Sequence, residues 1–422
     1  MQMRKYKLGD IATVEISGVD KKIKDGEEDI RLCNFVDVYY NWAITMARHD
    51  SFMLATARPN EISKFQLKKG QVALTKDSET RDDIGISTYI ADDFNDVILG
   101  YHCALITPNK DILDGRYLNA LMHTGYAKKY FAFNASGSGQ RYALSVEALN
   151  SFPVPRIPLR EQQRIGEIFS ALDKKIELNR RINQNLEAMA KQLYDYWFVQ
   201  FDFPDENGRP YKSSGGKMVW NEKLKREIPE GWDSIPIGNY APCKGGYAFK
   251  SSDFCKRRGV PVIKIGNIRD DYTLDMTDCQ CIENFDNSQF LAKRFDLVIA
   301  MTGATIGKFA ISQRDYWVNQ RVGRFELGDT PLNRLGYLFN SLKQDYFREQ
   351  IFQIASGCAQ PNISSEQIDA ILILKPKDSI LSQFNNICRS LLKQQSENLL
   401  QIEELTKQRD ELLPLLMNGQ VS

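Results

Sequence analysis

An internal repeat constrains this chain of 422 residues more than any other feature. Three motifs recur at a separation of 219 or 220 positions: Tyr117-Leu118 as Tyr337-Leu338, Ala135-Ser136-Gly137-x-x-Gln140 as Ala355-Ser356-Gly357-x-x-Gln360, and the segment 145–149 as 364–368. The halves also open alike, with Leu8-Gly9 matching Ile237-Gly238 at a separation of 229. Self-similarity over such a distance predicts two copies of one structural unit.

Each copy runs through a mixed region and then a long helical stretch. Strand-like runs rich in β-branched residues, such as residues 71–75 and 297–300, alternate with glycine turns. After Pro158 no proline occurs until Pro204, and apolar residues follow at heptad spacing. The sequence therefore predicts an α+β protein with two mixed domains separated by two long antiparallel helices that form a coiled coil.

The predicted central helix has about 33 residues and a length near 50 Å at 1.5 Å per residue. A polar Asn179 within the apolar seam would fix the register of a helix pair. A helix packed only on its own domain is the alternative. The seam residues are Ile165, Ile168, Leu172, Asn179, Ile182, Leu186, Met189 and Leu193 in the first helix, and Leu399, Ile402 and Leu405 in the second.

These patterns predict the domain boundaries. The first mixed domain would span residues 1–156, the central helix 157–203, a polar connector 204–232, the second mixed domain 233–377 and the C-terminal helix 378–422. The connector is rich in Gly, Ser and Pro, which is typical of a linker. Its length would let the chain return to begin the second half, and a flexible linker without a further role is an equally good interpretation of its middle.

Composition excludes several classes of protein. No apolar run approaches the roughly 18 residues that cross a bilayer, and residues 1–10 lack the apolar core of a secretion signal, so we expect a cytoplasmic protein without membrane contact. The eight cysteines form no disulfide framework, and the three histidines lie far from the Cys279-x-Cys281 pair, so no metal site is expected. With 55 basic and 54 acidic residues, charge alone does not indicate a nucleic-acid partner.

We find no enzyme motif. The segment from Gly303 to Lys308 resembles a phosphate-binding loop, but it has three residues between its glycines instead of four, and Phe309 stands where Ser or Thr would bind magnesium. We expect no catalytic residue in this chain.

Basic, amide and hydroxyl side chains concentrate in the turns of both mixed regions. Lys and Arg suit phosphates and guanine edges, while Asn and Gln suit adenine. For any single one of them, an ordinary solvated surface position is the simpler explanation. The candidate DNA-binding residues are Lys64, Lys68, Lys76, Ser78, Thr80 and Arg81 in the first half, and Lys244, Tyr247, Lys250, Asn267, Arg269, Thr302, Lys308, Asn319, Gln320 and Arg321 in the second.

Several motifs resemble those of the specificity subunits of Type I restriction-modification systems. They are Ile157-Pro158-Leu159-Arg160-Glu161-Gln162-Gln163-Arg164-Ile165, Leu193-Tyr194-x-Tyr196-Trp197-Phe198, Ile228-Pro229-Glu230-Gly231-Trp232, and Gln360-Pro361-Asn362-Ile363-Ser364. The resemblance covers essentially the whole chain. Two departures stand out: the second helix lacks the Glu-Gln-Gln entry, and Gln140 is followed by Arg141-Tyr142 instead of Pro-Asn.

The resemblance implies that each mixed domain reads one half of a split, asymmetric site in double-stranded DNA, and that the helices set the spacer. It also implies two methyltransferase (modification) subunits docked near the helices. S-adenosylmethionine would be bound on those partners, and ATP with magnesium on two restriction subunits, whose presence the sequence leaves open. The alternative is a coiled-coil scaffold that joins two protein-binding modules without reading DNA.

Overall fold

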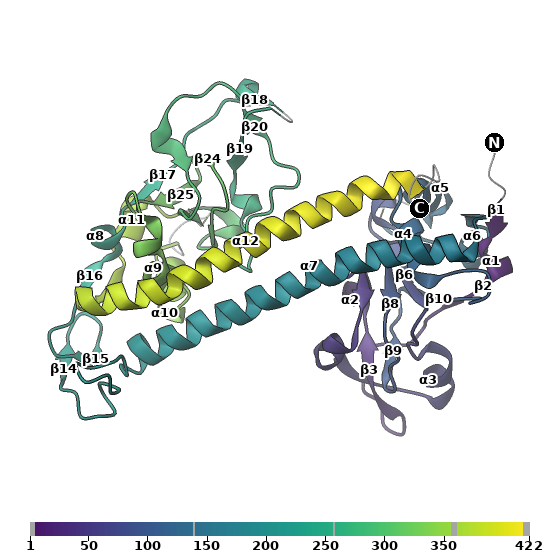
Figure 1. The fold of residues 1–422 in the computed structure, drawn as a ribbon, viewed down its shortest axis with the longest axis horizontal. Coiled ribbons are helices and arrows are strands. Elements are labelled where there is room, and N and C mark those ends of the chain that lie inside the picture. Colours follow the sequence, from purple (N-terminus) through teal and green to yellow (C-terminus); the bar gives the residue numbers. More distant parts are fainter. Residues whose placement is uncertain (1–4, 138–139, 256–257, 356–360, 417–422) are drawn as a thin grey trace. The chain divides into compact units, whose positions relative to one another are not determined.

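The computed structural model describes residues 5–137, 140–255, 258–355 and 361–416. The chain forms two compact units: residues 1–178 with 401–422, and residues 179–400. Each unit holds one mixed α/β domain and parts of two long helices, α7 (Leu159–Tyr194) and α12 (Asp378–Leu416) (Figure 1). The α+β class that the sequence predicts is therefore confirmed.

The first domain is built on a sheet whose two faces are both buried. Its strand order is β2 (Ala12–Ile16), β10 (Cys103–Pro108), β6 (Val72–Thr75), β8 (Ser87–Ile90) and β4 (Ala43–Ile44). Since side chains alternate along a strand, Val72 and Leu74 pack against the helices α4 (Gly115–Met122) and α5 (Gly125–Asn134). Ala73 instead packs against a second sheet of β5 (Met53–Ala57), β3 (Glu28–Cys33) and β9 (Val97–Leu99).

The second domain repeats this arrangement. Its main sheet has the order β17 (Cys243–Gly245), β25 (Val322–Phe325), β22 (Leu297–Ala300) and β23 (Phe309–Ile311). Leu297 and Ile299 share a core with the helices α9 (Leu335–Leu342) and α10 (Asp345–Ala355), whereas Val298 faces the second sheet. That sheet has the order β18 (Phe254–Cys255), β20 (Cys281–Ile282), β19 (Val260–Ile263), β24 (Tyr316–Val318) and β21 (Leu291–Ala292).

The helices confirm the repeat and its separations. α4 and α9 begin 220 positions apart (335 − 115), and α6 (Val146–Asn150) and α11 (Ser365–Asp369) begin 219 apart. α1 (Leu8–Ile11) and α8 (Ile237–Tyr240) begin 229 apart, as the sequence predicts. α6 and α11 start for the same reason, because Ser145 and Ser364 each cap the helix by accepting a hydrogen bond from the third backbone amide that follows. Residues 356–360 of the second copy lie outside the described residues.

Each domain is closed by a short antiparallel pair of strands next to its long helix. β1 (Lys5–Lys7) pairs with β13 (Pro153–Pro155), and β16 (Asp233–Pro236) pairs with β26 (Leu372–Lys375). The first and last strands of each domain therefore lie together, and the long helix follows directly.

The long helices run antiparallel within the second unit. Tyr194, at the end of α7, lies with its ring 6.0 Å from that of Phe384, near the start of α12. Asn183 lies earlier on α7 and contacts residues later on α12, where its side-chain oxygen accepts a hydrogen bond of 2.8 Å from Asn398. α7 has 36 residues, close to the predicted 33, and continues into a π-helical turn, η3 (Asp195–Val199), that buries Trp197 and Phe198.

The buried face of α7 differs from the predicted seam. Ile165 and Asn179 are buried, and Leu172, Ile182, Leu186 and Leu193 are half-buried, but Ile168 and Met189 are 37% and 55% exposed. Phe169, Ile176 and Ala190 are buried instead. On α12, Leu405 is buried while Leu399 and Ile402 are half-buried. The prediction is wrong at Ile168 and Met189 because the aromatic ring of Phe169 and the small Ala190, one position further along, occupy the inward side.

The connector is folded in part. β14 (Met218–Asn221) and β15 (Arg226–Pro229) form a hairpin, and Ile228 and Trp232 join the core of the second domain. A flexible middle is therefore the wrong interpretation for residues 218–229, because apolar residues among the polar ones anchor the hairpin. No helix among the described residues has the length and apolar character needed to span a membrane.

Candidate nucleic-acid interface

A groove of about 550 Å³ opens in the first domain at the ends of β6 and β10. Aromatic residues of α2 (Phe35–Tyr39) form one wall, and β7 (Asp77–Ser78) with the following turn forms the other. The residues that line it are Phe35, Val36, Tyr39, Tyr40, Asp77, Ser78, Glu79, Thr80, Asp83, His102, Gln140 and Arg141. The groove combines flat apolar rings with hydrogen-bonding groups of both kinds.

Asp77 is the hub of this groove. Its carboxylate receives hydrogen bonds of 2.9 and 3.0 Å from Lys76 Nζ, lies 2.5 Å from His102 Nδ1 and is 3.3 Å from Arg141 Nη2. Burial works to raise the pKa of Asp77, but the hydrogen bonds from His102 and Lys76 outweigh it and hold the pKa below its usual value. Asp77 is therefore a carboxylate at neutral pH.

A second polar pair joins α2 to the segment that follows β7. Tyr39 donates a hydrogen bond of 2.7 Å to Asp83. Burial and this hydrogen bond raise the pKa of Tyr39 to about 12, so its hydroxyl stays protonated.

The predicted residues of the first domain divide into two groups. Ser78 and Thr80 line the groove, Lys76 pairs with Asp77, and Arg81 stacks its guanidinium 5.0 Å from the ring centroid of Tyr142. Lys64, on α3 (Pro59–Phe65), pairs instead with Glu15 at 3.2 Å. Lys68 lies after that helix and is exposed. These two lysines are not among the residues that line the groove.

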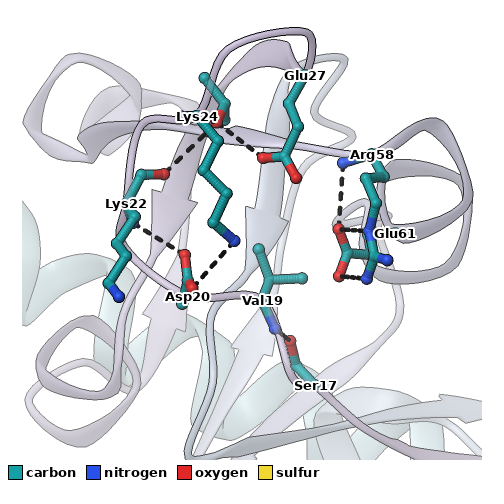
Figure 2. A network of polar contacts seen from close by, with 9 residues as sticks. Ser17, Val19, Asp20, Lys22, Lys24, Glu27, Arg58 and Glu61 are labelled. Atoms are coloured by element: carbon teal, nitrogen blue, oxygen red, sulfur yellow. Dashed lines mark hydrogen bonds and ion pairs between the residues drawn. The ribbon is translucent and has the colours of Figure 1, made fainter.

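One lysine of the loop that joins β2 to β3 is paired with an acidic residue (Figure 2). Lys24 pairs with Asp20 at 3.1 Å, and Glu27 accepts a hydrogen bond of 2.9 Å from Thr56 of β5. The neighbouring Arg58 and Glu61 form a further ion pair of 2.7 Å. Lys24 and Arg58 are therefore each compensated by a nearby acidic residue.

The second domain gathers predicted residues around the turn between β24 and β25. Asn319 pairs with Tyr247 through an isolated β-bridge, and Gln320 and Arg321 are exposed in the same turn. The backbone carbonyl of Arg321 accepts a hydrogen bond from Met301, which directly precedes Thr302. This turn therefore presents amide, guanidinium and hydroxyl groups together.

Another group lies in a groove of about 280 Å³ beside α10, where Lys308 pairs with Asp270 at 2.8 Å. Arg269 lines the same groove and pairs with Asp275. Lys343 and Arg348 also line it, although the sequence did not single them out.

The other predicted residues of this domain lie apart from both groups. Asn267 accepts a hydrogen bond from the Lys264 amide and donates one to Asp275, so it stabilises a turn. Lys244 on β17 and Lys250 in a nearby loop are exposed.

Among the described residues, no three His, Cys, Asp or Glu side chains gather as metal ligands. The geometry is that of two polar, aromatic-lined surfaces on one duplicated framework. Residues 2–188 and 229–401 match the sequence model of the Type I restriction modification DNA specificity domain, and together these ranges cover most of the chain.

The chain belongs to this family.

Curated relatives agree with the assignment. The chain is 25% identical over 418 residues to the Type I restriction enzyme HindI specificity subunit of Haemophilus influenzae, covering 85% of this chain and 88% of that protein. It is 24% identical over 314 residues to the MjaIX specificity subunit of Methanocaldococcus jannaschii, covering 74% and 70%. The crystal structure of the S subunit from M. genitalium shares the fold, with a TM-score of 0.58, 14% identity, and coverage of 98% of this chain and 96% of that one.

The protein is thus a DNA sequence-specificity subunit of a Type I restriction-modification system. Specificity subunits bind DNA and assemble with other subunits, which carry the catalytic activities. The chain itself is non-catalytic.

Sequence reasoning on this specificity subunit missed the groove residues Asp77, His102 and Arg141. An isolated acid reads as a solvated turn residue, and a lone histidine carries little signal. The repeat contained the missing information, because His102 lies 219 positions before Arg321, which was predicted. Aligning the two halves residue by residue would have identified His102.

Proposed function

We propose that the two mixed domains of this specificity subunit read different half-sites of one split, asymmetric DNA sequence. The observation that carries the proposal is the duplicated framework with unlike side chains: the first groove is built on Asp77 and His102, and the second turn on Asn319 and Arg321. A shared backbone can approach DNA in the same way twice, and different side chains then contact different bases. A palindromic site would need two identical readers.

The paired helices would set the distance between the half-sites and dock two modification subunits. Ile168 and Met189 on α7 support docking, because large apolar side chains that are 37% and 55% exposed suit a protein partner. The local ion pairs of the first domain also support a contribution of partner subunits to DNA binding. A basic residue that is already paired with an acidic one attracts DNA phosphates only weakly. The modification subunits would supply the remaining phosphate contacts.

Individual residues take roles by their placement. Tyr247, Ser78, Thr80, Thr302, Asn319, Gln320 and Arg321 would lie at base edges, while the exposed Lys68, Arg81, Lys244 and Lys250 would contact phosphates. Lys64, Lys76, Arg269 and Lys308 are each paired with a carboxylate and would contribute less to phosphate binding. Asn267 would act indirectly by holding its turn. The reading modules would be residues 1–156 and 233–377, with 157–203 and 378–422 as the helices and 204–232 as the connector.

The test is a domain exchange. Residues 1–156 are replaced by the corresponding domain of another specificity subunit, the complex with its modification subunits is assembled, and methylated positions are mapped on genomic DNA. We expect one half of the methylated sequence to change while the other half and the spacer stay the same. Replacing residues 233–377 is the matched control and should change only the opposite half. A change in both halves, or in neither, from a single exchange would contradict the proposal.

A further inference from the structure

Three residues of the first domain, Lys76, Asp77 and His102, have counterparts at the same places in the backbone of the second domain. In the first domain, the amide of Lys76 donates to the carbonyl of His102 at 2.9 Å, and the amide of Leu144 donates to the carbonyl of Lys76 at 2.8 Å. In the second domain, Met301 donates to Arg321 at 3.0 Å, and Ile363 donates to Met301 at 2.9 Å. Lys76 therefore corresponds to Met301, and His102 corresponds to Arg321.

The neighbouring bridge extends the correspondence. Asp77 pairs with Ala143 in the β7–β12 ladder, where β12 spans Tyr142–Ala143, and Thr302 forms an isolated bridge with Asn362, 219 positions after Ala143. Asp77 thus corresponds to Thr302. At one place in the fold, the first domain carries a carboxylate beside a histidine, and the second carries a hydroxyl beside a guanidinium.

The contacts around Asp77 cannot all be hydrogen bonds at once. Arg141 Nη2 lies 2.6 Å from His102 Nδ1, and the same ring nitrogen lies 2.5 Å from Asp77 Oδ2. A guanidinium only donates and a carboxylate only accepts, so Nδ1 would have to accept from Arg141 and donate to Asp77 at the same time. Only one of the two contacts is a hydrogen bond in any one state. The Arg141 side chain is 61% exposed and is the member able to leave.

The backbone of His102 also holds the ring in an uncommon position. Its φ of 69° lies in the left-handed region, which non-glycine residues adopt rarely. Residues that do adopt it are frequently found at functional sites. In this conformation the imidazole lies between Asp77 and Arg141 and lines the groove.

We propose that Asp77 is a specificity-determining residue of the first domain and accepts a hydrogen bond from the exocyclic amino group of a cytosine in the major groove. Arg141 moves from the hub to a DNA phosphate, which opens one side of the carboxylate to the base, while Lys76 keeps the other side ionised. This inference rests on the function proposed above and deepens it by naming one base contact.

The chemistry favours cytosine over adenine. The major-groove edge of cytosine offers the N4 amino donor, to which Asp and Glu side chains bind. Adenine offers its amino group beside the acceptor N7, which a carboxylate would repel, so Asn and Gln suit adenine better. In the second domain, Thr302 is the counterpart of Asp77, and Arg321, the counterpart of His102, would donate to a guanine beside it. The two half-sites would then be read with different hydrogen-bonding groups in this part of the framework.

The test selects bound sequences from random double-stranded DNA with the assembled complex of specificity and modification subunits. With the unsubstituted subunit, we expect a split site that has a cytosine at one position of the first half. With Asp77→Asn, the preference for cytosine at that single position should fall by about tenfold, because one mismatched pair is worth roughly 1–3 kcal/mol. Every other position, including the whole second half-site, should keep its preference.

A second variant tests whether a lost preference reflects misfolding of the first domain instead of the loss of the Asp77 contact. The double substitution Lys76→Met with Asp77→Thr installs the two residues that the second domain already holds on the same framework, and it should lose the same preference. Asp83→Asn is the matched control, since Asp83 lies in the same groove but pairs with Tyr39, and it should leave the cytosine preference unchanged.

The outcomes separate the two proposals. If the unsubstituted complex selects no split site, the proposed function fails. If it selects one and the Asp77→Asn and double variants retain the parental preference at every position, the inference about Asp77 alone is overturned. The same holds if Asp83→Asn relaxes the position as strongly as Asp77→Asn does.

Discussion

The two mixed domains share a framework and differ in chemistry at corresponding positions. The strand order of the main sheet, the serine caps of α6 and α11 and the closing strands repeat, yet Asp77 and His102 stand where the second domain has Thr302 and Arg321. The charge of Asp77 is held among cations, whereas no acidic side chain in the described ranges pairs with Arg321. The two domains thus share a backbone framework and differ in the polar side chains that stand at corresponding places on it.

The same contrast occurs where the helices α4 and α9 end. His123 caps α4, and its ring stacks on Trp42 with centroids 4.3 Å apart. Lys343, 220 positions later, caps α9 and forms an ion pair of 2.6 Å with Glu187 of α7. A neutral aromatic contact in one domain corresponds to a charged contact in the other, and this difference gives the two domains different responses to pH.

The largest difference in stability between the two domains should come from substituting a pair of equivalent glycines. Gly85 and Gly307 both have φ of +80° and each faces the equivalent residue of the following helix. A Cβ at Gly85 would overlap the ring of Phe131, whereas a Cβ at Gly307 would lie 3.1 Å from Cγ2 of Ile351. We expect Gly85→Ala to lower the free energy of unfolding of its domain by about 3 kcal/mol, from left-handed strain and overpacking together. Gly307→Ala should cost about 1.5 kcal/mol, mainly strain.

Amide hydrogen exchange during a urea titration would measure this, because peptides from each domain report separately. Equal losses in the two variants would show that the helix contacts are alike, and the comparison of the cores would then be wrong. A loss that spreads to peptides of the unsubstituted domain would mean that the domains do not unfold independently.

The sequence predicted the framework well. The repeat separations of 219 and 220 positions match those between the starts of α6 and α11 and of α4 and α9, because caps such as Ser145 and Ser364 depend on local chemistry. The length of α7 followed from the interval free of proline. The buried face of α7 was predicted less well, since Ile168 and Phe169 are both apolar and heptad spacing alone does not tell which one faces inward.

The groove could not be predicted in the same way. Asp77, His102 and Arg141 are distant in sequence, and strand pairing in β7 and the left-handed backbone of His102 bring them together. Lys64 and Lys76 look equivalent in the sequence, yet Lys64 pairs with Glu15 outside the groove, whereas Lys76 pairs with Asp77 inside it. Tertiary pairing decided the role of each basic residue.

A drop in pH should destabilise the first domain more than the second, by a smaller amount than the substitution of Gly85 does. Burial lowers the pKa of His123 from 6.5 to about 4, so the folded state holds the neutral ring, whose Nε2 donates to the carbonyl of Ser87. The unfolded chain takes up the proton below pH 6.5 and the folded one only near pH 4, so stability is complete above pH 6.5 and falls as the pH drops through this window. Between pH 7 and pH 5, His123 should cost the first domain about 2 kcal/mol.

The measurement is the urea midpoint of peptides from each domain at pH 7 and pH 5. His123→Gln, which keeps a side-chain donor, should remove most of the extra sensitivity of the first domain to acid. The second domain, which has Lys343 at this place, supplies the internal control. If His123→Gln leaves the pH response of the first domain intact, another group is responsible.

The smallest effect concerns the repeated tyrosines. Tyr117 and Tyr337 are both almost fully buried, but the Tyr337 hydroxyl donates a hydrogen bond of 2.5 Å to the carbonyl of Leu374 on β26. Within the described part of the chain, the hydroxyl of Tyr117 has no such partner. Tyr337→Phe should therefore cost the second domain about 1 kcal/mol by leaving a buried carbonyl unpaired, while Tyr117→Phe should change the first domain by less than about 0.5 kcal/mol. Unfolding of both variants, followed by amide hydrogen exchange, measures this difference in free energy. If Tyr117→Phe costs more than Tyr337→Phe, the hydrogen bond to β26 does not distinguish the two cores.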